Sequence, residues 1–167
     1  PANANTIEPR PIRLQAKGEK YTLTFTARAD RTTHNSGCGF AMLGPGGKAV
    51  RLVAWTRSNN AWRFDARGIT DSIPGQRDRF GREWPGGVDE DVTCRIVVDA
   101  GGHWVHGSVT GADGVVHRSR VYELPVRFTQ AVNTLVIEQD RRPGSGPMDT
   151  ADINVTAEPA PPIVRTT

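Results

Sequence analysis

Aromatic, histidine and arginine side chains recur at every second position in three stretches of the chain. The residues are Trp55 and Arg57; Trp104 and His106; and Arg118, Arg120 and Tyr122. An aromatic ring offers a flat apolar face against which the C–H surface of a sugar can stack. A guanidinium fork donates hydrogen bonds to hydroxyl groups and grips a carboxylate at two points. The spacing predicts a binding surface if each stretch is a strand, because residues two apart then share a face.

The alternation of polar and apolar residues supports strands. It is strict from Tyr21 to Ala27 and is echoed at 92–98 and 153–156, whereas no segment keeps the apolar spacing of a helix over ten residues. Glycine-rich turn signals divide the chain into short segments. We predict strands near residues 10–16, 20–29, 37–44, 48–57, 60–67, 92–99, 103–110, 114–123, 132–140 and 150–157. The expected fold is all-β, an antiparallel two-sheet β-sandwich with little helix.

Period two then assigns the side chains to faces. If the apolar residues at even positions of 48–57 face the core, Trp55 and Arg57 face solvent. In the 103–110 strand, Val105 and Val109 are expected to face the core, so Trp104 and His106 point outward. The register of the 114–123 stretch is ambiguous. A single β-bulge would reverse any of these assignments. The alternative for each tryptophan is structural, covering the core from a sheet edge.

Two further tryptophans lie in different settings. Trp62 is in phase with Phe64 and is predicted to lie in the core. Trp84 lies in the long polar connection between Gly68 and Asp91, where it either walls a binding groove or plugs the sheet. Connections of this length are usually functional or disordered.

Length and charge limit the classes of protein to which the chain can belong. Its 167 residues suit one domain, assigned to residues 1–157, with a proline-rich tail or linker at 158–167 that suggests an adjacent domain. A net charge of +3 without a run of basic residues predicts no nucleic-acid partner, and no stretch is apolar enough for a membrane span. Only three of the 21 basic residues are lysine. The arginine excess favours anionic ligands or reflects a GC-rich genome.

The chain has two cysteines, Cys38 and Cys94. Each is in phase with neighbouring apolar residues, which predicts burial. A disulfide and a pair of buried thiols both remain open, because the sequence does not show the separation of the Cα atoms. Two cysteines without a CxxC spacing do not make a zinc site.

Three stretches together resemble a known family. They are the opening strand Tyr21–Arg28, the hairpin from Thr93 to Val109, and the closing pair formed by Asn133–Glu138 and Asp149–Val155. Their order is similar to the concanavalin A-like (laminin-G/pentraxin-like) jelly rolls found beside catalytic domains in secreted carbohydrate-active enzymes. The resemblance implies a jelly-roll sandwich and carbohydrate recognition. It also implies a possible structural Ca²⁺, for which Asp149 and Asp152 are candidate ligands, although ordinary solvated turn aspartates are the alternative.

The expected function is that of a lectin-like, non-catalytic carbohydrate-binding module of a secreted bacterial multidomain enzyme. The ligand is a polysaccharide, preferably acidic, and the other partner is the adjacent domain of the parent protein. A purely structural or protein-interaction module is one alternative.

Enzymatic alternatives use the same fold. A polysaccharide lyase needs a base, for which His106 or Tyr122 qualifies, and arginines that neutralise a uronate. A glycoside hydrolase needs two carboxylates, and the spacing of Glu138 and Asp140 permits it. Neither activity has a recognised signature in the sequence.

Overall fold

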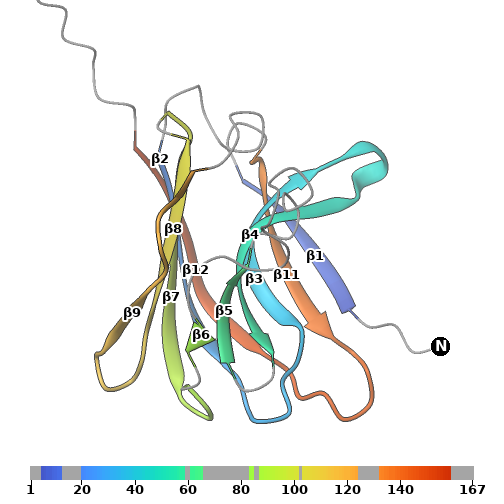
Figure 1. Cartoon of the computed structure of the whole chain (residues 1–167). Coiled ribbons are helices and arrows are strands. Elements are labelled where there is room, and N and C mark those ends of the chain that lie inside the picture. Colours follow the sequence, from blue (N-terminus) through green and yellow to red (C-terminus); the bar gives the residue numbers. More distant parts are fainter. Residues whose placement is uncertain are drawn as a thin grey trace, which may run out of the picture.

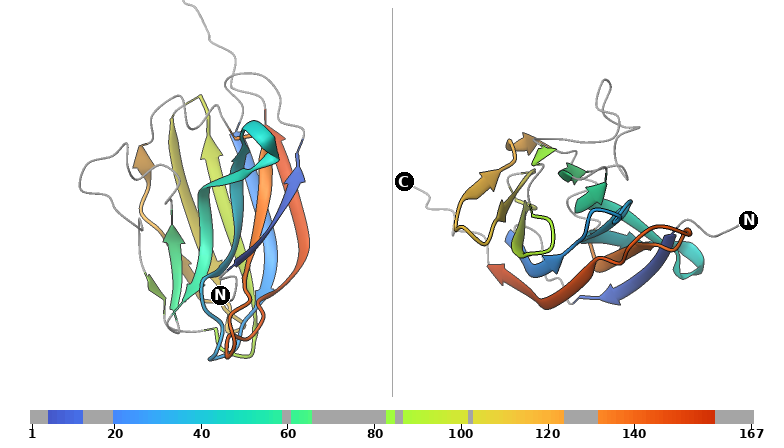
Figure 2. Two further views of the ribbon diagram at one scale, coloured as in Figure 1. Left: turned by 90° about the vertical axis from the view of Figure 1, so that its right-hand side faces the viewer. Right: turned by 90° about the horizontal axis from the view of Figure 1, so that it is seen from below.

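Two antiparallel sheets face each other across a hydrophobic core in the computed structural model, which describes residues 5–12, 20–58, 61–65, 83–84, 87–101, 103–123 and 132–158. Sheet A has the order β1 (Asn5–Pro11), β11 (Thr134–Asp140), β3 (Ser36–Leu43), β4 (Ala49–Ser58), β5 (Ala61–Asp65) and β6 (Glu83–Trp84). Sheet B has the order β10 (Tyr122–Glu123), β8 (Trp104–Thr110), β7 (Asp91–Asp99), β2 (Lys20–Arg28) and β12 (Asp149–Glu158), with β9 (Val116–Arg118) also paired to β8. In Figure 1, β7, β8 and β9 lie on the left, and β1, β3 and β11 on the right. Figure 2 shows the two layers from the side and from below.

The predicted all-β, two-sheet architecture is confirmed. Every ladder between named strands is antiparallel, and the one helical element of the described residues is the 3-10 turn Pro45–Gly47 in the β3–β4 hairpin. Gly46 and Gly47 have φ of 76° and 75°, as the predicted glycine-rich turn requires. No helix in the described ranges is long and apolar enough to cross a membrane.

The first strand begins five residues earlier than predicted, and residues 13–16 of the predicted strand lie outside the described residues. β1 spans Asn5–Pro11 and pairs with β11, whereas the sequence pattern favoured residues 10–16. Pro9 and Pro11 lack the N–H group that a central strand needs. The edge of sheet A tolerates them because one side of an edge strand makes no ladder bonds.

The core is built mainly from large residues on the inner faces of the two sheets. Trp62 and Phe64 on β5 are fully buried, which confirms their predicted core position. Cys38 on β3 and Cys94 on β7 are also buried, and both are free thiols. Burial raises the pKa of Cys38 to about 12; burial and the nearby Cys38 also raise the pKa of Cys94.

A β-bulge reverses the predicted faces of β4. Phe40 on β3 pairs with Val53, but the next residue, Ala41, pairs with Arg51, so Leu52 is the extra residue. As a result, Trp55 and Arg57 point into the core, where they are 1% and 0% exposed. The prediction that these two side chains face solvent is therefore wrong.

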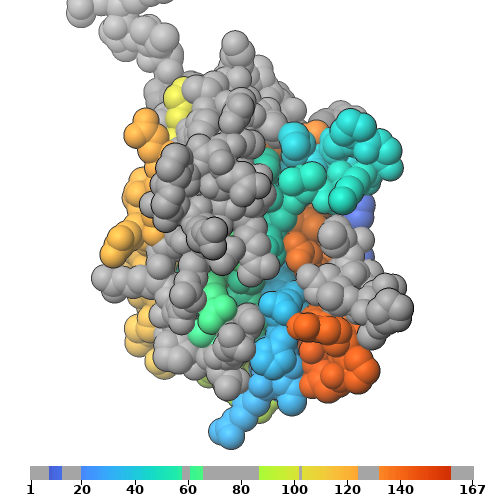
Figure 3. Space-filling view, turned by 45° about the vertical axis from the view of Figure 1, so that its right-hand side comes forward, coloured from blue at the N-terminus to red at the C-terminus, as the bar shows by residue number. Residues whose placement is uncertain are grey.

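Two connections lie together at one end of the sandwich. The β2–β3 connection and the β11–β12 connection are side by side in Figure 3, where they form the lower right of the molecule. The Gly146 amide donates to the Thr32 carbonyl at 3.2 Å, and the Thr33 hydroxyl donates to the Pro147 carbonyl at 3.2 Å. These bonds tie the two sheets at this end, because β2 and β12 belong to sheet B while β3 and β11 belong to sheet A.

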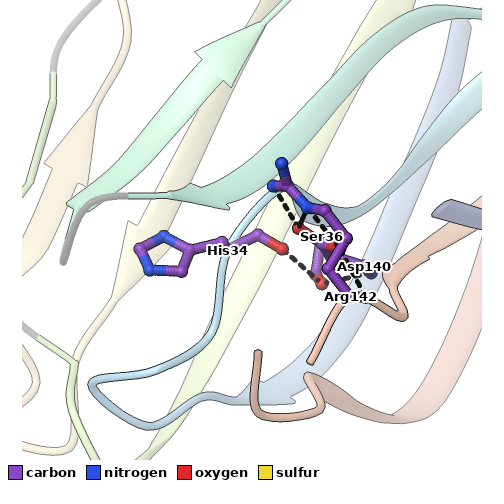
Figure 4. A network of polar contacts seen from close by, with 4 residues as sticks. All are labelled: His34, Ser36, Asp140 and Arg142. Atoms are coloured by element: carbon purple, nitrogen blue, oxygen red, sulfur yellow. Dashed lines mark hydrogen bonds and ion pairs between the residues drawn. The ribbon is translucent and has the colours of Figure 1, made fainter. Parts of the chain in front are cut away.

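A polar network at the end of β11 reinforces this region (Figure 4). The Ser36 hydroxyl donates to the His34 carbonyl at 3.0 Å and accepts from the Asp140 amide at 3.2 Å. The Asp140 carboxylate accepts from Arg142 Nε at 3.0 Å and from its Nη2 at 2.6 Å. These hydrogen bonds with Arg142 hold the pKa of Asp140 at about 2, well below its usual value.

Candidate ligand-binding groove

The outward face of β8 carries the candidate site. Val105, Gly107 and Val109 are buried against the core, while the residues that alternate with them point outward and are half-buried. The outward side chains are Trp104, His106, Ser108 and Thr110. The predicted outward orientation of Trp104 and His106 is thus confirmed.

Cross-strand pairing aligns one row of polar side chains across sheet B. Thr24 on β2 pairs with Arg95 on β7, Arg95 pairs with Ser108 on β8, and Ser108 pairs with Arg118 on β9. Paired residues of antiparallel strands share a face. Arg95 and Arg118 are two strands apart, about 10 Å at the Cα atoms, and the small Ser108 lies between them.

An open groove of about 450 Å³ lies along this row. Its described lining includes five hydroxyl-bearing residues, Thr24, Thr93, Ser108, Thr110 and Ser119. It also includes Arg95, Arg118 and His106, and no described lining residue is acidic. The groove can therefore donate many hydrogen bonds and attracts anionic groups.

A second hollow, of about 500 Å³, continues from the groove. It is bounded by Trp104, His106, Val121 and Glu123, and it shares His106 and Val121 with the first. The rings of Trp104 and His106 are stacked, with centroids 5.3 Å apart and planes 19° from parallel. Val121 is 65% exposed, so an apolar side chain faces solvent beside the aromatic pair.

The surroundings of His106 favour its neutral form. Burial, followed by the nearby positive charges of Arg95 and Lys20, lowers its pKa below the usual value. The imidazole is therefore neutral at neutral pH and can accept a hydrogen bond or a proton. Lys20 also lies beside Trp104, with its Nζ 5.9 Å from the ring centroid.

A break between β9 and β10 separates residues that were predicted to share a side. The Ser119 amide donates to the Gly107 carbonyl at 2.8 Å, and the Ser119 hydroxyl accepts from the Gly107 amide at 2.8 Å. After this break Tyr122 pairs with Val105 on the inner face and packs against the core. The prediction that Tyr122 joins Arg118 on one face is wrong, and burial raises the pKa of Tyr122.

Arg120 lies within the same break. It is exposed, and it is not among the described residues that line either hollow. The structure therefore brings together Trp104, His106 and Arg118, but it leaves Arg120 outside the groove.

The two buried β4 residues, Trp55 and Arg57, do not line the groove. Trp55 Nε1 donates to the Arg95 carbonyl oxygen at 3.0 Å, so the indole supports the strand that forms the floor of the groove. Arg57 lies over the Trp62 ring, 5.6 Å from its centroid, and burial lowers its pKa. Neither side chain can contact a ligand in the groove.

Trp84 stays a prediction as a ligand contact. Its backbone pairs with Trp62 at the β5–β6 ladder, but its side chain lies outside the described residues, as does most of the 68–91 connection. The 158–167 tail is likewise described only at Glu158.

The two candidate calcium ligands lie on the edge strand β12. Asp149 and Asp152 are exposed, Asp149 pairs with Arg28, and Asp152 has a φ of 53° beside a register shift in β12. No group of three or more histidine, cysteine or acidic side chains able to hold a metal occurs within the described ranges. The calcium site stays a prediction.

The carboxylates considered for a hydrolase are engaged elsewhere. Glu138 Oε1 lies 3.2 Å from Arg51 Nη1, and Asp140 is bound by Arg142. A glycosidase needs one carboxyl group that stays protonated. The low pKa of Asp140 weighs against that role.

Three groove residues were not among the predicted ligand contacts: Thr24, Arg95 and Ser108. All three lie at outward positions of strands with alternating apolar and polar residues. That alternation could have identified their orientation. Their alignment with Arg118 depends on strand register, which the sequence does not encode locally.

Comparison with solved structures defines the class of fold. The Lotus tetragonolobus seed lectin superposes with a TM-score of 0.60 at 12% identity, over 93% of this chain and 80% of that one. A family 7 alginate lyase in complex with substrate gives 0.57 at 11% identity, over 88% of this chain and 64% of that one. Basic winged bean lectin with Tn-antigen gives 0.56 at 11% identity, over 90% and 77%. The chain has the concanavalin A-like jelly-roll fold. No protein-family model and no curated protein matches its sequence.

Proposed function

We propose that the chain is a non-catalytic carbohydrate-binding module whose ligand lies in the groove on sheet B. The observation that carries the proposal is the row Thr24, Arg95, Ser108 and Arg118 beside the stacked Trp104–His106 pair. Hydroxyl and guanidinium groups recognise sugar hydroxyls, and the aromatic and apolar side chains at the end of the groove offer surface for a ring.

The setting of the module is part of the proposal. Its fold is shared by lectins solved with galactose and with Tn-antigen, and the proline-rich composition of 158–167 suits a linker to a further domain. The proposed parent is a secreted, bacterial, multidomain enzyme, and the linker-like composition of the tail supports the multidomain part of this proposal. Affinity per site is expected to be weak, because an open and wet groove buries little area.

The test is a glycan array probed with the purified chain and with single variants. Trp104→Ala and Arg118→Ala should each weaken binding about tenfold. Arg28→Ala is the matched control, because Arg28 is an exposed arginine of sheet B that faces Asp91 at 3.5 Å, outside the groove lining. Failure to bind any glycan would leave the structural-module alternative.

One observation favours a lyase as second candidate. The neutral imidazole of His106 lies in the same groove as Arg95 and Arg118, so a base and a carboxylate-neutralising pair are close together. In such a reaction the base removes the C5 proton beside the carboxylate, the electron pair of that bond forms a C4=C5 double bond as the C4–O4 bond breaks, and the departing O4 gains a proton. Absorbance of an unsaturated uronate product, lost in His106→Gln, would identify the enzyme; its absence with all acidic polymers leaves the binder.

A further inference from the structure

The charges along the groove are strongly asymmetric. At the row of Ser108, two guanidinium groups flank a small hydroxyl side chain, and no carboxylate lines the described wall. At the row of Trp104, the paired neighbours are Asp99 on β7 and Glu123 on β10. The groove is therefore positive at its Ser108 end and has carboxylates on both sides at its Trp104 end.

Among the described residues, neither the Arg95 nor the Arg118 side chain has a hydrogen-bond or ion-pair partner. Lys20 lies at the opposite end, beside Trp104, and pairs with Asp99 in register. Two guanidinium groups whose Cα atoms are about 10 Å apart can close on one anion between them, because each side chain spans several bonds.

The two ends are far enough apart to contact different sugar units. Trp104 and Ser108 are four residues apart on β8, about 13 Å along the strand. This separation is longer than one pyranose ring, so a ligand that reaches both ends must be an oligosaccharide. Asp99 and Glu123 disfavour a second negative charge beside Trp104 unless Lys20 offsets it.

We infer that the groove selects an anionic polysaccharide that lies along β8, with a carboxylate or sulfate group held between Arg95 and Arg118 above Ser108 and a sugar ring against the Trp104 end. This inference rests on the proposed function and adds the ligand class, the position of the charge and the direction of the chain. The shared chemistry is a fixed negative group on a sugar, whether uronate or sulfate ester.

The experiment compares polymers that differ only in charge. Polygalacturonate and alginate are each paired with their esterified forms, and dextran sulfate is paired with dextran. Binding of the purified chain is measured by affinity electrophoresis at low and at high salt. The charged polymer of at least one pair should bind at least tenfold more tightly than its neutral form, and this preference should shrink with salt because the charges are screened.

Single and double variants test which side chains cause the preference for the charged polymer. Arg95→Ala and Arg118→Ala should each reduce binding to the charged polymer about tenfold, and the double variant should bind the charged and neutral forms equally. Arg28→Ala, on the same sheet, should keep the preference. Trp104→Ala should weaken both forms by the same factor. Thermal unfolding of each variant verifies that it is folded.

The outcomes separate this inference from the proposed function. If neutral and charged forms bind alike and Trp104→Ala weakens both, the groove binds glycans but the anion clamp is wrong. A preference that survives in the Arg95→Ala, Arg118→Ala double variant also overturns the clamp. If the unmodified chain binds none of the polymers, both the proposed function and the anion clamp are wrong. A preference confined to dextran sulfate identifies the anion as sulfate, and one confined to the uronate polymers identifies it as carboxylate.

Discussion

The indole of Trp55 on sheet A donates a hydrogen bond to the carbonyl oxygen of Arg95 on sheet B, at 3.0 Å. The side chain of Arg95 lines the groove on the opposite face of sheet B. The core of the sandwich and the floor of the candidate site are thus joined at one peptide group. Substitutions in the core beneath β7 should affect both stability and binding.

Trp55→Phe should lower the free energy of unfolding by about 2–4 kcal/mol, because it removes buried volume and leaves the Arg95 carbonyl without this donor. Urea denaturation measures the change. Trp104→Phe is the control, since Trp104 is only half-buried on the outer face, and it should cost less than about 1 kcal/mol. Equal losses in the two variants would contradict the assigned faces.

Gly107→Ala should destabilise the sandwich by about 1–3 kcal/mol or more, because overpacking a core forces its neighbours to move. A Cβ at this position would lie 2.6 Å from Phe64 Cε1 and 2.7 Å from Trp55 Nε1. Thermal unfolding measures the effect. Gly44→Ala is the matched control: its Cβ would lie 3.6 Å from the nearest atom, the Lys48 carbonyl oxygen, and its φ is −90°. A Gly107→Ala protein as stable as Gly44→Ala would show that the inter-sheet contact is looser than described.

Removing the charge of Asp140 should alter the acid sensitivity of the protein. Its pKa is about 2 in the folded state against 3.8 ordinarily, so the unfolded chain takes up the proton more readily. The carboxylate therefore stabilises the fold above about pH 4, by roughly 2 kcal/mol, and this contribution is lost as pH falls toward 2.

Asp140→Asn should accordingly be less stable than the parent at pH 7, with the difference vanishing near pH 2, as measured by urea denaturation over that range. Asp91→Asn is the control. Asp91 faces Arg28 at 3.5 Å with both side chains more than half exposed, and such surface pairs contribute little. A pH-independent deficit in Asp140→Asn would mean that shape, rather than charge, determines its role.

The thiols of Cys38 and Cys94 should be unreactive in the folded protein. Burial raises the pKa of both groups, and the thiolate is the form that attacks a disulfide reagent. Titration with an aromatic disulfide reagent at pH 8 should detect two thiols in denaturant and almost none without it. Fast reaction of the native protein would show that the core opens readily, and no reaction in denaturant would reveal a disulfide.

Local alternation determined most of the strands of this protein and the outward direction of Trp104 and His106. The strands β2, β7 and β8 lie within one residue of their predicted bounds. In each, apolar residues must face the core at every second position, because burying them is the main favourable term in folding. That requirement can be seen within a few neighbouring residues, so no knowledge of the partner strand is needed.

Cross-strand pairing determined the rest. The extra residue Leu52 moved Trp55 and Arg57 from the solvent face to the core, and the break at Ser119 placed Tyr122 on the inner face. Bulges and breaks arise where two strands must match one another and the packing between sheets, so neither strand's own sequence reveals them. The same holds for the row that aligns Arg95 and Arg118 on either side of Ser108, because register is a property of a pair of strands.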